Sequence, residues 1–221
     1  MRVVVTGGAG FIGSNLAEEL LKKHEVTVID NLSTGRIENL DQIIDKINFI
    51  EGSITDQDLL KEAFSGSDTV FHQAAIPSVQ RSVDNPIASN EANVEGTLKV
   101  LVAARDCNVR KVVYASSSSA YGDTPTLPKK EEMKPNILAM QSPAEGVFNI
   151  ACGQRVSLNE LAGKIMKITG VKLDPIYDEP RQGDVRDSLA DISSARDKLG
   201  YRPDFDLDSG LEETIRWFRK N

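Results

Sequence analysis

The sequence predicts an α/β fold: a doubly wound parallel sheet followed by a small C-terminal α/β region. Strand-like and helix-like segments alternate up to about residue 116. A glycine-rich turn follows the first strand, and the second strand ends on an acidic residue. Because this alternation produces parallel strands covered by helices on both faces, we expect a ligand beyond the carboxyl ends of the strands.

Short apolar and β-branched runs mark the strands of the first part, and the helices lie between them. We expect strands over residues 3–5, 25–30, 47–51, 69–72 and 111–116, and helices over residues 14–23, 56–64 and 87–106. Asp56 is placed to cap the second helix.

After residue 116 the pattern changes. Residues 122–135 are loop-like, and residues 137–140 are too short to form a helix on their own. Beyond them we expect strands over 146–150 and 173–177, an amphipathic helix over 157–169 with a Ser157/Glu160 capping box, a polar loop over 180–191, and closing helices over 192–199 and 207–220.

Composition excludes several classes of protein. The 221 residues are 40% hydrophobic and 27% charged, which is typical of a soluble globular chain. A net charge of -7 does not indicate a nucleic-acid surface, and no apolar run approaches membrane-spanning length. Residues 3–5 already form a core strand, so we expect no signal peptide. Cys107 and Cys152 show no metal-binding spacing, and we expect buried thiols in a reducing cytoplasm and no metal.

The turn after the first strand has the spacing of a dinucleotide-binding site. Gly7 allows a tight turn, Gly10 lets the backbone approach a pyrophosphate, and Gly13 lets the helix pack closely on the strand. The helix N-terminus would face the phosphates, and Asp30 would accept hydrogen bonds from ribose hydroxyls. The alternative is a tight turn without a ligand, which leaves Asp30 unexplained. We therefore predict a Rossmann fold.

Further motifs lie along the whole chain, at residues 6–13, 30–35, 72–75, 93–97, 116–123 and 181–184. On these segments the chain resembles the extended short-chain dehydrogenase/reductase family, and within it the nucleotide-sugar 4-epimerases that act on UDP-glucose and UDP-N-acetylglucosamine. The resemblance implies an NAD-binding Rossmann domain over residues 1–136. Residues 137–221 would complete the sheet and form the nucleotide-sugar-binding region.

The resemblance implies NAD as the cofactor. Its binding residues would be Gly7, Gly10, Phe11, Ile12, Gly13, Asp30, Asn31, Ser33, Thr34, Gly35, Ser53, Ile54, Gln73, Ala74, Ala75, Ile76 and Asn93. An anionic Asp30 would repel the 2′-phosphate of NADP, although Arg36 is close by in sequence. Asn93 lies inside a predicted helix, where Asn is unfavourable. We expect it either to bond nearby backbone or to be an ordinary surface residue.

The resemblance also implies a UDP-sugar substrate, bound through Ser78, Arg81, Ser118, Arg181 and Asp184. Ser117 would be catalytic, with its hydroxyl hydrogen-bonded to the sugar 4-oxygen. The plain alternatives are a serine-rich strand end that caps backbone groups, and a solvated charged loop at residues 181–184. Because 4,6-dehydratases place Asp and Glu where Ser118 and Ser119 stand, dehydration is disfavoured. His72 has no catalytic pattern around it and is expected to be structural.

One part of the family pattern is absent, namely a Tyr followed by a Lys four residues later. The four tyrosines are Tyr114, Tyr121, Tyr177 and Tyr201, and the residues four positions after them are Ser118, Pro125, Arg181 and Phe205. The family's Tyr-Lys helix would follow residue 136. Either an internal stretch has been deleted, or the molecule contains a segment that the printed sequence omits.

We therefore predict an NAD-dependent UDP-sugar 4-epimerase, an isomerase of carbohydrate metabolism that works by transient oxidation at C4 and forms a homodimer if full length. It is predicted to be inactive if the Tyr-Lys segment is truly missing. Two alternatives stay open: a cofactor-binding module without catalysis, and another nucleotide-sugar enzyme of the family, such as a sugar-acid decarboxylase or reductase.

Overall fold

A computed structural model describes residues 1–117, 134–152, 154–178 and 189–219. The chain forms two compact units, residues 1–116 and residues 117–221. The domain boundary between residues 136 and 137 stays a prediction.

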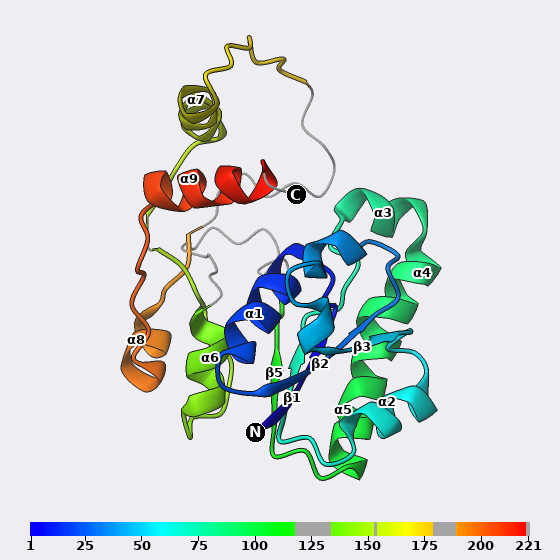
Figure 1. The fold of residues 1–221 in the computed structure, drawn as a ribbon. Coiled ribbons are helices and arrows are strands. Elements are labelled where there is room, and N and C mark those ends of the chain that lie inside the picture. Colours follow the sequence, from blue (N-terminus) through cyan, green and yellow to red (C-terminus); the bar gives the residue numbers. More distant parts are fainter. Residues whose placement is uncertain (118–133, 153, 179–188, 220–221) are drawn as a thin grey trace. The chain divides into compact units, whose positions relative to one another are not determined.

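The first unit contains a five-stranded sheet with helices on both faces (Figure 1). Its elements are β1 (Arg2–Thr6), α1 (Phe11–Leu21), β2 (Glu25–Asp30), the 3₁₀ turns η1 (Ile37–Leu40) and η2 (Ile44–Lys46), β3 (Asn48–Glu51), α2 (Gln57–Phe64), β4 (Thr69–His72), α3 (Val79–Asp84), α4 (Pro86–Asn90), the π-helix η3 (Glu91–Gly96), α5 (Thr97–Asp106) and β5 (Lys111–Tyr114).

All strand pairs are parallel and the strand order is β3-β2-β1-β4-β5, which confirms the predicted doubly wound sheet. The chain moves outward from β1 to β3 and then returns to β4, on the other side of β1. The neighbouring ends of β1 and β4 are therefore the topological switch point, where open α/β sheets bind ligands. In Figure 1 the strands rise from the N-terminus, so these ends lie at the upper edge of the sheet.

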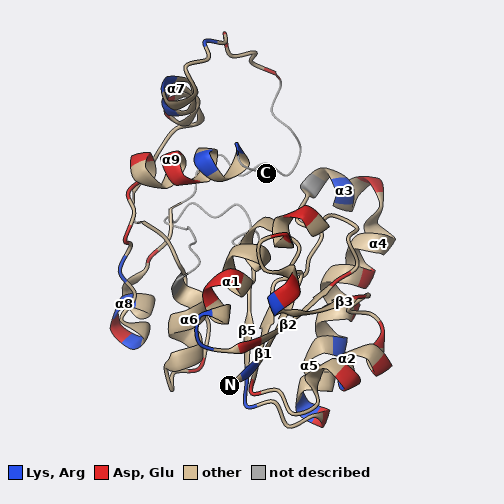
Figure 2. Ribbon diagram, viewed as in Figure 1, with Lys and Arg blue, Asp and Glu red and all other residues tan. Residues whose placement is uncertain are grey.

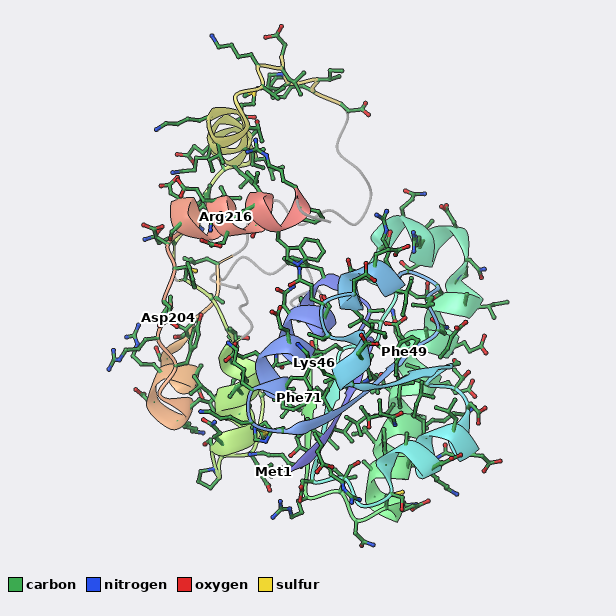
Figure 3. The ribbon with its side chains drawn as sticks, in the orientation of Figure 1. Met1, Lys46, Phe49, Phe71, Asp204 and Arg216 are labelled. Atoms are coloured by element: carbon green, nitrogen blue, oxygen red, sulfur yellow. The ribbon has the colours of Figure 1, made fainter. Side chains whose placement is uncertain are left out.

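The core lies on both faces of the sheet, because successive strand side chains alternate between the faces. On one face Val4 and Val70 pack with Leu60 and Phe64 of α2 and with Val100 of α5. The opposite face is covered by α1. Phe71, fully buried, lies inside this unit (Figure 3).

Most elements of the first unit were predicted, with differences at their ends. Helix α1 begins at Phe11 rather than residue 14, and β5 ends at Tyr114 rather than residue 116. The expected helix over 87–106 is continuous but contains the π-helical turn η3. Helix α3 was missed because it has only six residues, although Ser78 caps it.

In its described residues the second unit consists of helices joined by irregular segments. It contains α6 (Lys134–Gln141), α7 (Leu158–Thr169), α8 (Ser193–Leu199) and α9 (Leu207–Phe218). Residues 137–140 belong to α6, which starts three residues earlier. The predicted capping box of α7 is confirmed, and Gly170 ends that helix in a left-handed conformation with φ 76°. Its small core surrounds Tyr201, whose hydroxyl donates to the Ala151 carbonyl at 3.0 Å.

The strands expected over 146–150 and 173–177 are wrong. Neither segment pairs with a strand among the described residues, and a strand needs a neighbour to satisfy its backbone groups. Phe148 and Ile150 instead pack as irregular chain on the small core, while Ile176 is 96% exposed. The loops were expected over 122–135 and 180–191, and their residues 122–133 and 180–188 lie outside the described residues. Lys134 and Pro135 belong to α6 instead of the first loop.

The cysteines are half-buried and free rather than buried. Cys107 lies at the C-terminal end of α5, and its thiol donates to the Lys61 carbonyl at 3.4 Å. In the described part of the chain, no helix is long and apolar enough to cross a membrane, and no group of His, Cys, Asp or Glu residues could hold a metal ion. Acidic and basic residues are interspersed over the helices (Figure 2).

Candidate functional site

The glycine turn between β1 and α1 needs glycine at two positions for steric reasons. Gly7 has φ +71°, and a Cβ on it would lie 2.6 Å from the backbone of Ala74. A Cβ on Gly13 would lie 2.2 Å from the Gly7 carbonyl oxygen. The expected tight turn at Gly7 and close packing at Gly13 are therefore confirmed.

Gly10 differs from these two glycines because a Cβ on it would meet only the Gly7 carbonyl oxygen, at 3.2 Å. The backbone of this turn is thus accessible from outside the packed core. Gly10 is the N-cap of α1, and no described side chain caps the helix or places an acid in its first turn. The positive end of the helix dipole is therefore left for an external anion. Phe11 and Ile12 begin the helix and are partly exposed, at 37% and 39%.

Asp30 lies at the end of β2, beside the glycine turn, and is only 8% exposed. Its two carboxylate oxygens accept hydrogen bonds from the Ala9 N–H at 2.9 Å and the Leu32 N–H at 2.8 Å. These bonds fix the orientation of the carboxylate and leave lone pairs for further donors, since an ionised carboxylate accepts about four hydrogen bonds. The carboxylate is thus held ready to accept from hydroxyl groups of a ligand.

The loop after Asp30 folds back onto the glycine turn. The Ala9 carbonyl accepts from the Arg36 N–H at 3.0 Å and from the Asn39 side chain at 2.7 Å. Asn31 accepts from the Ser33 N–H at 3.1 Å, and Thr34 is exposed. A Cβ on Gly35 would lie 2.9 Å from Asp30 Oδ1. The contribution of Ala9 and Asn39 was not predicted, because it depends on a backbone partner distant in sequence.

Ser53 and Ile54 follow β3. The Ser53 hydroxyl lies 2.8 Å from that of Thr55 and accepts from the Thr55 N–H at 3.1 Å, so it shapes the turn into α2. Ile54 is buried, and a Cβ on Gly96 would lie 2.6 Å from its Cδ1. The η3–α5 helix therefore approaches this loop closely, and Lys99 Nζ also donates to the Thr55 carbonyl at 2.8 Å.

The loop of Gln73, Ala74, Ala75 and Ile76 follows β4. It is held at its start by the Gln73 N–H, which donates to the Thr6 carbonyl at 3.0 Å. It is held at its end by Asn93, which accepts from the Ile76 N–H at 2.8 Å and donates to the Ile76 carbonyl at 3.2 Å. The expectation that Asn93 bonds nearby backbone is thus confirmed.

His72 lies fully buried at the end of β4, and burial lowers its pKa to about 4. Its Nδ1 is 2.7 Å from the Thr6 hydroxyl and its Nε2 is 3.0 Å from the Thr97 hydroxyl. The ring also stacks on Tyr114, with the centroids 5.3 Å apart. The imidazole is therefore neutral near pH 7.

The expected cofactor residues all lie at the carboxyl ends of the strands of the first unit, in the loops that follow them, at the start of α1, or on η3. The expected substrate residues are less well placed. Ser78 caps α3 by accepting from the Arg81 N–H at 3.2 Å, and the Arg81 side chain is exposed. Ser117 is exposed and is the first residue of the second unit. Ser118, Arg181 and Asp184 lie outside the described residues.

The chain is similar along its whole length to several known proteins. It is 31% identical over 310 residues to the UDP-glucose 4-epimerase of Mycolicibacterium smegmatis, covering 99% of both chains. It is 27% identical over 306 residues to a putative UDP-glucose 4-epimerase of Methanocaldococcus jannaschii, again covering 99% of both. An alignment of 306 positions exceeds the 221 residues of this chain, so at least 85 positions have no counterpart here.

Solved structures agree with this similarity. The UDP-N-acetylglucosamine 4-epimerase of Methanobrevibacter ruminantium has a TM-score of 0.90 at 28% identity, covering 99% of this chain and 98% of that one. The UDP-glucose 4-epimerase of Thermotoga maritima has a TM-score of 0.91 at 28% identity, covering 100% and 99%. The sequence profile of one family matches residues 3–143, well over half of the chain. The chain therefore belongs to the NAD dependent epimerase/dehydratase family.

Proposed function

We propose that this chain is an NAD-dependent UDP-sugar 4-epimerase, acting on UDP-glucose and UDP-galactose or on their N-acetyl forms. The observation that carries the proposal is similarity to 4-epimerases over 99% of the chain. Similarity over about half of the chain does not separate the enzymes of the family. For example, 55% of the chain is 42% identical over 122 residues to a UDP-N-acetyl-alpha-D-glucosaminuronate decarboxylase of Bacillus cytotoxicus.

The residues at the strand ends fit NAD. The backbone around Gly10 and the start of α1 would hold the pyrophosphate, and Asp30 would accept from the adenosine ribose hydroxyls. Ser53 and Ile54 would border the adenine, and residues 73–76 with Asn93 would border the nicotinamide half. Since Asp30 is a nearly buried anion, it repels a 2′-phosphate and favours NAD over NADP. Arg36 is exposed, and its backbone N–H donates to the Ala9 carbonyl.

When bound, NAD would supply a reversible acceptor for the hydride of sugar C4. The substrate roles of this chain's residues follow from the family resemblance. The Ser117 hydroxyl would hydrogen-bond the sugar 4-oxygen, and Ser78, Arg81 and Ser118 would contact the sugar side of the substrate. Arg181 would neutralise the diphosphate and Asp184 would accept from the uridine ribose. Gripping the nucleotide leaves the sugar free to rotate between the two hydride transfers.

The chain of 221 residues lacks a base for this reaction. No tyrosine in it has a lysine four residues later. The tyrosine that would accept the proton of the sugar hydroxyl, with its pKa lowered by that lysine, is therefore missing. The 85 or more unmatched alignment positions indicate that an internal segment is absent. This observation favours a second candidate function for the 24.2 kDa molecule, namely NAD binding without turnover.

We also propose that the chain, if full length, associates as a homodimer. Four large apolar residues, Ile87, Val94, Leu98 and Leu101, are exposed on the helix formed by α4, η3 and α5. Their helical spacing places them along one seam, and a two-fold axis would pair this face with itself. Replacing Leu98 with Glu should reduce the mass measured by light scattering to that of a monomer. A cytoplasmic location is part of the proposal, since free thiols suit a reducing compartment.

The test uses a preparation whose intact mass is verified. NAD binding is measured by titration calorimetry, and UDP-glucose and UDP-N-acetylglucosamine are incubated with NAD for product analysis. At 24.2 kDa we expect NAD binding and no epimerised sugar. A larger molecule that contains the Tyr-Lys segment should interconvert the 4-epimers. Lack of NAD binding would refute the cofactor site, and robust turnover at the short mass would refute the assignment of the base.

A further inference from the structure

His72 is a buried titratable residue that the proposed chemistry does not use. It links three elements, because β1 supplies Thr6, β4 supplies His72 itself, and α5 supplies Thr97. Thr6 and His72 are also paired in the register of the two strands at the switch point. The imidazole thus lies directly beneath the place where the chain leaves the sheet for the loop of residues 73–76.

The hydrogen-bond geometry determines the tautomer. The Thr97 hydroxyl donates its one proton to the Asn93 carbonyl at 2.9 Å. Thr97 can therefore only accept from His72, so the proton of the neutral ring is on Nε2. Nδ1 is then an acceptor, and the Thr6 hydroxyl donates to it. Each donor in the series Thr6, His72, Thr97 has one defined acceptor.

This series ends at the nicotinamide side of the proposed cofactor site. Thr97 bonds the carbonyl of Asn93, and Asn93 clamps both backbone groups of Ile76 through its side-chain amide. Asn93 lies in the π-helical turn η3, and such turns are common at functional sites. The bond from His72 to Thr97 therefore fixes the turn that carries the clamp.

We propose that His72, acting through Thr97, is a positioning residue that holds the loop of residues 73–76 in place for the nicotinamide half of the cofactor. The inference rests on the proposed NAD site. His72 does not touch the cofactor in this role. It acts by restricting Asn93, and through Asn93 the Ile76 backbone, before the cofactor arrives.

The test separates the two halves of the cofactor. Thr97→Val keeps the size of the side chain but removes the hydroxyl, whereas Thr97→Ser keeps the hydroxyl. Thr69→Val is the control for the same chemical change elsewhere in the sheet, because Thr69 lies at the opposite end of β4 from His72. Dissociation constants are measured for NAD and for ADP, which lacks the nicotinamide half. Amide hydrogen exchange of Ile76 is measured without any ligand.

For Thr97→Val we expect NAD to bind about tenfold more weakly and ADP to bind within about twofold of the unaltered chain, since one part-buried hydrogen-bond link is lost. The Ile76 amide should exchange about tenfold faster. Thr97→Ser and Thr69→Val should leave both measurements near those of the unaltered chain.

Equal weakening of NAD and ADP in Thr97→Val would indicate a general structural role and overturn the inference. Unchanged NAD binding with unchanged Ile76 exchange would also overturn it, and would leave the cofactor site intact. If the unaltered chain bound no NAD, the cofactor site and this inference would both be wrong.

Discussion

Lowering the pH from 7.5 to 5 should destabilise the first unit through His72. Burial lowers the pKa of His72 to about 4, whereas an unfolded chain leaves it at its ordinary value of 6.5. Between these values the unfolded state binds the proton and the folded state does not. The stabilisation is therefore fully present above pH 6.5 and is lost progressively as the pH falls towards 4.

At pH 5 the loss should be about 2 kcal/mol, because 1.5 pH units separate this pH from the unfolded value and each unit is worth about 1.4 kcal/mol. His24, whose pKa is also lowered by burial, acts in the same direction. A comparison with His72→Gln isolates the effect, since glutamine keeps a donor and an acceptor but does not titrate.

The assay is amide hydrogen exchange of β1 and β4, whose slowest amides report unfolding of this unit. The free energy of unfolding of the unaltered chain should fall by about 2 kcal/mol more than that of His72→Gln between pH 7.5 and 5. Equal losses in the two proteins would show that His72 can take up its proton in the folded state. The reasoning from its burial would then be wrong.

Three further predictions concern the cofactor, the glycine turn and the substrate. NAD should bind more tightly than NADP, and Asp30→Asn should narrow the difference between the two dissociation constants. Equal dissociation constants for NAD and NADP in the unaltered chain would contradict the role of Asp30. Gly13→Ala should destabilise the first unit by roughly 1–3 kcal/mol, because its Cβ would lie 2.2 Å from the Gly7 carbonyl oxygen. The control is Gly163→Ala in α7, where a Cβ meets open space, and this variant should be about 0.5–1 kcal/mol more stable than the unaltered chain. Thermal unfolding measures the stability of both variants. If both substitutions stabilised the protein, the steric argument would be refuted. Arg181→Ala should weaken UDP binding roughly thirtyfold, for a loss of about 2 kcal/mol, while the NAD affinity measured by calorimetry stays constant. Unchanged UDP affinity in a folded Arg181 variant would end the diphosphate assignment.

The fold of the first unit was predictable because its signals are local. Most strands contain a short apolar run. Asp56 caps α2 as expected, with its side chain accepting from the Asp58 and Leu59 N–H groups. The second unit was predicted less well because a strand depends on its neighbours. Residues 146–150 have a strand-like sequence but no strand partner among the described residues.

In the candidate site, too, the local features were predictable and the contacts between distant residues were not. The glycine spacing and Asp30 were visible in the sequence, since their roles depend on one βα turn. The bonds of Ala9 to Asn39 and of His72 to Thr97 join residues 30 and 25 positions apart. No local pattern indicates such pairs, and only the folded chain brings them together.

The η3 helix contacts both halves of the proposed cofactor site, the adenine half and the nicotinamide half. This arrangement has a thermodynamic consequence. Gly96 packs on Ile54 beside the adenine loop, while Asn93, one turn earlier, holds Ile76. A ligand that orders either loop restrains the same helix, so the second loop has less freedom left to lose. An adenine nucleotide and a nicotinamide mononucleotide, added as separate fragments, should therefore each raise the affinity for the other by the same factor, as linkage requires.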